Sequence, residues 1–165
     1  MSISPGFRRF AAVCAFASAI TTLAVHLLPP LLPAARTLEE AARLHDHPIH
    51  VARLWIVILH VWIVFVTAWA AALQLAPRAL GWAGLGLFGY GVFTIAELTR
   101  TCLALFAVNR WRAAFLDPGT PETVRASLRT LLEGWPGVGL GLFAVFGIGF
   151  LIGNLSLGVA AARGR

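Results

Sequence analysis

The chain has 165 residues, of which 59% are hydrophobic and 12% charged, whereas about 25% of the residues of a soluble domain are charged. This composition argues against a water-soluble globular protein and leaves no stretch for a separate soluble domain. The net charge of +6 arises from arginines, without a single lysine. Because the arginines are scattered over the ends of apolar stretches, they suit lipid headgroups and not nucleic acid.

Four long apolar stretches cover residues 10–32, 51–75, 79–108 and 135–162. Each has the roughly 20 residues that a helix needs to cross a hydrocarbon core about 30 Å thick. Backbone groups in lipid must be hydrogen-bonded within their own segment, so each stretch is expected to be helical. The sequence therefore predicts an all-α membrane protein, with residues 1–165 forming one domain: an antiparallel bundle of four transmembrane helices.

The first apolar stretch follows Arg8 and Arg9 and is longer than the 7–15 apolar residues, roughly, of a signal peptide. It is therefore predicted to be a retained helix. Five arginines on the side of the termini and seven on the opposite side do not settle the orientation. Because Arg8 and Arg9 flank the first inserting helix, we expect both termini in the cytoplasm and the protein in a bacterial cytoplasmic membrane.

The connections between the apolar stretches differ in length. Only a few residues around Pro77 and Arg78 separate the second and third stretches, which predicts a tight hairpin. Residues 33–50 and 109–134 form longer loops on one face of the membrane. Apolar residues at helical spacing within them predict two short interfacial helices, at residues 36–45 and 121–133.

Ionisable residues lie at similar depths in the first three apolar stretches. Counted from the loop side at 1.5 Å per residue, His26, His60, Glu97 and Arg100 lie about 9–16 Å below the surface. On the first helix, Ser18, Thr22 and His26 recur every four residues and so share one face. Ionisable groups at membrane depth are costly to bury and usually mark function.

Two interpretations of this polar layer are open. In the first, it is a ligand or proton site: imidazoles at matched depth are suited to axial ligation of haem b, to proton relay or to hydrogen bonding with a quinone. In the second, it is a structural clasp. Glu97 and Arg100 then pair with each other, which limits the cost of burying either charge, and His26 and His60 bond to backbone or hydroxyl groups.

A second group of histidines lies in the first longer loop. His45, Asp46, His47 and His50 supply three imidazoles and a carboxylate within six residues, ligands that zinc and copper accept. The spacing matches no specific metal motif, and Pro48 interrupts the segment. The alternatives are a surface metal site and an ordinary solvated loop.

Glycines recur every four residues in the fourth apolar stretch, at Gly137 and Gly141 and again at Gly149 and Gly153. Such pairs expose backbone to a neighbouring helix and allow close approach. The expected partner is another helix of the same bundle. The alternative is a second copy of the chain or another membrane protein.

The sequence contains no phosphate-binding loop, zinc-protease motif, nucleophile elbow or haem-attachment motif, and no catalytic residue is predicted. The leading interpretation is a non-catalytic accessory or scaffold subunit that packs in a larger membrane complex through its glycine-rich faces. The alternative is a redox or proton-handling protein that binds haem b or quinone at the polar layer. An oligomeric small transporter is a more distant third.

Overall fold

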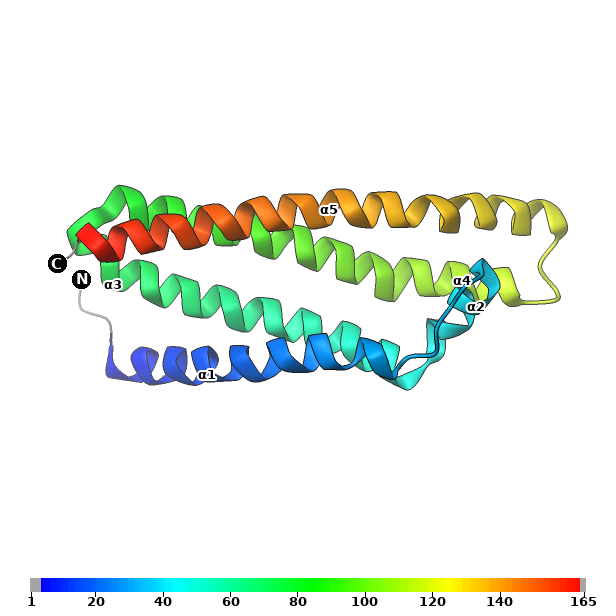
Figure 1. The fold of residues 1–165 in the computed structure, drawn as a ribbon, viewed down its shortest axis with the longest axis horizontal. Coiled ribbons are helices and arrows are strands. Elements are labelled where there is room, and N and C mark those ends of the chain that lie inside the picture. The colour runs from blue at the N-terminus through cyan, green and yellow to red at the C-terminus, as the bar shows by residue number, and fades with distance from the viewer. Residues whose placement is uncertain (1–3, 164–165) are drawn as a thin grey trace.

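The computed structural model describes residues 4–163, and the regular structure in that range is helical (Figure 1). Three continuous helical segments are long and apolar enough to cross a membrane: Pro5–Leu31, Pro48–Leu116 and Glu122–Arg163. The prediction of an all-helical chain with several membrane-length apolar helices is thus confirmed.

Helix α1 (Pro5–Leu27) begins and ends at residues suited to those places. The hydroxyl of Ser4 accepts a hydrogen bond from the Phe7 amide at 3.2 Å, and Pro5 occupies the first turn, where its missing N–H leaves no donor unpaired. At the other end, a 3₁₀ turn, η1 (Pro29–Leu31), replaces the α-helix, because consecutive prolines cannot donate the bonds that would continue it.

Helix α2 (Leu38–Ala42) continues into the 3₁₀ turn η2 (Arg43–Asp46). Thr37 and Glu40 form a capping box, in which each side chain bonds to the backbone of the other. Backbone N–H groups of Arg36 and Thr37 donate to the Glu40 carboxylate and hold its pKa below the ordinary value of 4.5. The helix predicted at residues 36–45 is therefore present, but only its first half is α-helical.

Helix α3 (Pro48–Cys102) contains both the second and the third apolar stretches. Its backbone leaves the helical region at Ala79 (φ −151°, ψ 61°), two residues after Pro77, whose ring disrupts the preceding turn. Figure 1 shows that the chain reverses there, so that α3 consists of two antiparallel arms, residues 48–78 and 80–102. The predicted reversal near Pro77 and Arg78 is confirmed.

The second arm does not end where the apolar stretch ends. It continues through a π-helical segment, η3 (Leu103–Val108), into helix α4 (Asn109–Leu116). Helix α5 (Glu122–Arg163) then begins only a few residues later. The separate interfacial helix predicted at residues 121–133 is wrong: those residues form the first turns of α5, and the connection is only residues 117–121.

Apolar contacts at the loop-side end explain why these helices are longer than predicted. Leu128 and Leu132, at the start of α5, are buried against Phe115 of α4 and Val108. Ala42 of α2 joins the same cluster. Burial of this stripe favours helix beyond the lipid-facing residues, whereas the hydropathy of the sequence reports only which residues suit lipid.

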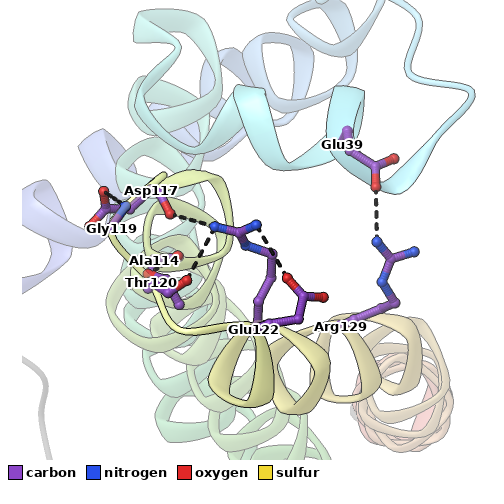
Figure 2. Close-up of polar contacts among 8 residues, drawn as sticks. Glu39, Ala114, Asp117, Gly119, Thr120, Glu122 and Arg129 are labelled. Carbon is purple, nitrogen blue, oxygen red and sulfur yellow. Dashed lines mark hydrogen bonds and ion pairs between the residues drawn. The ribbon is translucent and has the colours of Figure 1, made fainter.

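Polar contacts also fasten the loop-side end (Figure 2). The hydroxyl of Thr120 donates to the carbonyl of Ala114 at 2.7 Å, which closes the turn at residues 117–121. Arg129 of α5 reaches Glu39 of α2 at 3.4 Å. The loop-side helices are therefore linked to one another by both apolar and charged contacts.

The long helices are arranged around α3. Helix α1 packs on α3 and helix α5 packs on α3, while in the described part of the chain α1 and α5 barely contact each other. The first turn of α1, the reversal at Ala79 and the last turn of α5 lie at one end of the molecule, and α2 and α4 lie at the other (Figure 1). The bundle is consequently open between α1 and α5.

Candidate functional site

A cleft of about 430 Å³ lies where α1 and α5 fail to meet, with the two arms of α3 behind it. A volume of this size falls within the roughly 300–1,000 Å³ of small-molecule sites. Its serine, threonine and histidine lining residues come from α1 and the first arm of α3. Its phenylalanine and tyrosine lining residues come from the second arm of α3 and from α5. The lining residues are Ser18, Thr22, His26, His60, Val64, Thr67, Ala68, Ala71, Tyr90, Phe93, Phe146, Phe150 and Leu157.

The hydroxyl groups of the polar wall are already engaged. Ser18 donates to the carbonyl of Ala15 at 2.7 Å, and Thr22 donates to that of Ser18 at 2.7 Å. Thr67 donates to the carbonyl of Ile63 at 2.9 Å. A hydroxyl carries one proton, so these side chains retain only acceptor capacity. The imidazoles of His26 and His60 are the lining groups of this wall that offer a ring nitrogen for hydrogen bonding or metal ligation.

The two imidazoles both make their contacts through Nδ1. Nδ1 of His26 lies 2.8 Å from the carbonyl of Thr22, and because a carbonyl only accepts, Nδ1 carries the proton. Nδ1 of His60 lies 2.8 Å from the hydroxyl of Thr21, which also lies 2.9 Å from the carbonyl of Ala17. Since a hydroxyl can either donate or accept, this contact is compatible with both neutral tautomers of His60. Neutral His26 keeps a lone pair at Nε2, and His60 does so when Nδ1 carries its proton.

The opposite wall of the cleft is a group of aromatic rings. The ring of Phe93 lies 4.7 Å from that of Phe146 and 5.7 Å from that of Phe150, measured between centroids. Tyr90 packs edge-on against Phe150 at 6.0 Å. The Tyr90 hydroxyl turns to Asn154 of α5, to which it donates at 3.0 Å. The wall therefore offers flat apolar surface to a ligand ring.

Glu97 and Arg100 do not line the cleft. Arg100 pairs with Glu97 through two hydrogen bonds, one of them from Nε to Oε2 at 2.8 Å. The Glu97 side chain is only 8% exposed. The four predicted members of the polar layer thus form two separate groups, an imidazole pair at the cleft and an ion pair behind it.

The structure does not gather the residues of the candidate surface metal site around one point. Among residues 4–163 no group of three or more His, Cys, Asp or Glu side chains is placed to hold a metal ion. His45 bonds through Nδ1 to the carbonyl of Ala42, Asp46 has a side chain that is 78% exposed, and His50 contacts Asn109 of α4. Nδ1 of His45 also lies 3.8 Å from Oδ1 of Asp46, but because η2 ends at Asp46 and α3 begins at Pro48, His50 turns to a different neighbour.

The four glycines predicted to pack a helix behave as two different pairs. A Cβ atom on Gly149 would lie 2.7 Å from the backbone nitrogen of Phe93, and one on Gly153 would lie 2.7 Å from the ring of Tyr90. Gly137 and Gly141 have open space at the same position. Gly149 and Gly153 therefore bring α5 against the second arm of α3, whereas Gly137 and Gly141 make no close contact with the described chain.

Several residues of the cleft were not predicted from the sequence. Thr21 contacts His60, but nothing in the sequence singled this residue out. It lies at nearly the same depth as its neighbour Thr22. Phe146 and Phe150 follow Phe143 at intervals of three and four residues, a spacing that indicates a common helical face. The spacing does not show which helix this face packs against. The aromatic wall could therefore be identified only from the structure.

Comparison with known proteins adds no assignment: neither a family model, nor a curated protein, nor a solved structure matches this chain.

Proposed function

We propose that this chain is a four-span protein of a bacterial cytoplasmic membrane that binds a quinone-class molecule in the cleft between α1 and α5. The observation that carries the proposal is the composition of that cleft, in which two imidazoles face a wall of four aromatic rings. The spans are α1, the two arms of α3, and α5. Both termini lie in the cytoplasm, the side on which Arg8 and Arg9 flank the first span.

The chemistry of the cleft suits the reduced form of such a ligand. With Nδ1 protonated, the Nε2 lone pairs of His26 and His60 are acceptors for the hydroxyl groups of a quinol. The rings of Phe93, Phe146 and Phe150 supply offset and edge contacts to its flat ring. In the bilayer, a cleft on the side of the protein opens to lipid, where quinols are dissolved, so the ligand enters without crossing water.

A binding titration of the purified protein in detergent with decylubiquinol tests this proposal. We expect the ligand to raise the melting temperature, because binding to the folded state alone stabilises it.

Two histidine variants should each weaken binding about tenfold, which corresponds to the loss of one hydrogen bond of ~1.4 kcal/mol. They are His60→Phe, which preserves ring volume, and His26→Ala, at the exposed rim of the cleft. His45→Ala and Phe88→Ala, which change residues outside the cleft lining, are the matched controls. Equal weakening in the controls, or no response in the unmodified protein, contradicts the proposal.

Haem b is the second candidate, supported by the position of the two imidazoles in one cleft and by the contact of His26. A haem-ligating histidine coordinates iron through one nitrogen while the other donates to a carbonyl or hydroxyl, as Nδ1 of His26 does; Nδ1 of His60 has the hydroxyl of Thr21 as its partner. An absorption spectrum before and after dithionite separates the candidates. A Soret band that sharpens into α and β bands on reduction, and is lost in His60→Phe, assigns haem; a featureless visible spectrum leaves the quinol.

A role as a non-catalytic subunit of a larger membrane complex is compatible with ligand binding. Its support is the surface of α5 around Gly137 and Gly141, where nothing lies within 4 Å of the position of a Cβ atom. Gly149 and Gly153 no longer support docking, because the second arm of α3 occupies them. The partner in this role approaches the loop-side half of α5.

A further inference from the structure

A group of basic side chains lies at the loop-side end of α3, away from the cleft. Nε2 of His50 lies 3.5 Å from Nη1 of Arg112, and both groups approach Oδ1 of Asn109, at 3.3 and 3.5 Å. Arg53 follows His50 by three residues and so lies on the same face of α3. Helices α3 and α4 thus bring the guanidinium group of Arg112 and the imidazole of His50 together, with Arg53 one turn farther along α3.

These two arginines have no carboxylate partner. The ion pairs of the described residues are His45–Asp46, Glu97–Arg100, Glu122–Arg125 and Glu39–Arg129. Arg53 is half-buried and donates from Nε to the carbonyl of Val25 at 3.3 Å, and Arg112 is half-buried beside Asn109. The carboxylate whose charge acts on Arg53 is that of Glu97, which is already hydrogen-bonded to Arg100. A half-buried cation without a counter-ion is costly, so this group calls for an anion from outside the chain.

The position of the group indicates the source of that anion. It lies where the apolar part of α3 begins, which is the level of the lipid headgroups if the arms of α3 cross the membrane. Trp55 on the first arm of α3 and Phe106 in η3 pack edge-on with centroids 6.0 Å apart, and each residue is about half exposed. Aromatic side chains of this kind are typical of the membrane interface, and basic pockets between transmembrane helices bind anionic headgroups.

We propose that Arg112 and His50 bind the phosphate group of an anionic phospholipid at the loop-side surface of the membrane. The guanidinium group of Arg112 donates to phosphate oxygens, a charge-assisted contact that is stronger than a neutral hydrogen bond. The lipid links α3 and α4 at this end, because His50 belongs to α3 and Arg112 to α4. This site is separate from the cleft and does not depend on the nature of the ligand bound there.

The test is native mass spectrometry of the full chain, with phosphatidylglycerol, phosphatidylcholine or inorganic phosphate added in turn. We expect one phosphatidylglycerol to be retained, with phosphatidylcholine bound about tenfold more weakly and inorganic phosphate not retained, since the phosphate contacts and the apolar chains act together. Arg112→Gln should weaken retention of phosphatidylglycerol about tenfold, the loss of a hydrogen bond to a charged group.

Arg110→Gln is the matched control, because it removes the same charge from an exposed position of the same helix. It should leave retention unchanged. Arg112→Gln leaves the contact between Arg53 and Val25 intact, and His50→Gln provides a second variant if the first folds poorly. Equal effects of Arg110→Gln and Arg112→Gln would overturn the proposal, as would equal retention of the two lipids. Retention of inorganic phosphate in place of the lipid would also overturn it.

Discussion

Glu97 and Arg100 show how a pair of charges is accommodated deep in an apolar helix. Because they are three residues apart on α3, the guanidinium reaches the carboxylate without help from another helix. The pairing leaves neither charge unmatched, and it was predictable from sequence spacing alone. Their separation from the cleft was not predictable, because spacing along one helix does not show which neighbour covers it.

Removing one member of this pair is expected to destabilise the protein strongly. Glu97→Gln leaves the Arg100 guanidinium partly buried without a counter-charge, which should lower the free energy of unfolding by about 3–5 kcal/mol. Glu122→Gln is the matched control, since Glu122 also pairs with an arginine three residues later but is 84% exposed, and it should cost less than about 1 kcal/mol. Denaturant unfolding in detergent measures both. Equal losses would show that the Glu97–Arg100 pair is hydrated.

The two histidines of the cleft illustrate how far residue-level reasoning extends. Counting residues from the loop side placed His26 and His60 at similar depth, and both line the same cleft. The count did not reveal that Thr21 contacts Nδ1 of His60, because a side chain from another helix supplies that contact. Counting residues gives the depth of a side chain in the membrane. The direction in which that side chain points around the helix axis depends on how the helix packs against its neighbours.

At the scale of elements, α5 is the helix whose extent the sequence misjudged. Its apolar stretch begins near Trp135, but the helix begins at Glu122 and passes through Pro136. Composition marks the part of a helix that suits lipid, while helix formation itself continues wherever one face can be buried. Leu128 and Leu132 provide that face. The second longer loop predicted from hydropathy, residues 109–134, was therefore too long, because the connection between α4 and α5 is only residues 117–121.

The glycines of α5 give the sharpest prediction at this scale. Gly149→Ala would place a Cβ atom 2.7 Å from a backbone nitrogen of α3, which cannot move aside as a side chain can. We expect a loss of about 1–3 kcal/mol, the range for overpacked sites. Gly141→Ala, on the open part of the same helix, should change the stability by less than about 0.5 kcal/mol. Thermal unfolding of the two variants distinguishes them, and a neutral Gly149→Ala would show that α5 lies farther from α3.

At the scale of the whole molecule, the reversal at Ala79 decides the topology. If each arm of α3 crosses the membrane, the chain crosses four times and its termini share one side. Cysteines placed at Ser4 and Arg163, in a chain whose Cys14 and Cys102 are replaced, should then react with an impermeant maleimide from the same side. A cysteine at Gly119 should react from the opposite side. Labelling of positions 4 and 163 from opposite sides would mean that α3 crosses only once.

The open side of the bundle is the feature that sequence reasoning could not anticipate. Hydropathy identifies helices that are suited to cross a membrane, but it does not show which pairs of helices touch. Here α5 is drawn to the second arm of α3 by Gly149 and Gly153, while α1 packs on α3. The cleft follows from these separate contacts, and so does the proposed ligand site.

Photolabelling with an azido-quinone tests the central claim most directly, because it reports where the ligand lies. After reduction to the quinol, irradiation and digestion, mass spectrometry should find attachment on α1 between Ser18 and His26 and on α5 between Phe146 and Leu157. Excess decylubiquinol should suppress both signals. Attachment confined to exposed apolar positions outside the cleft, such as Phe16 and Leu140, or labelling that the competitor leaves unchanged, would contradict the account.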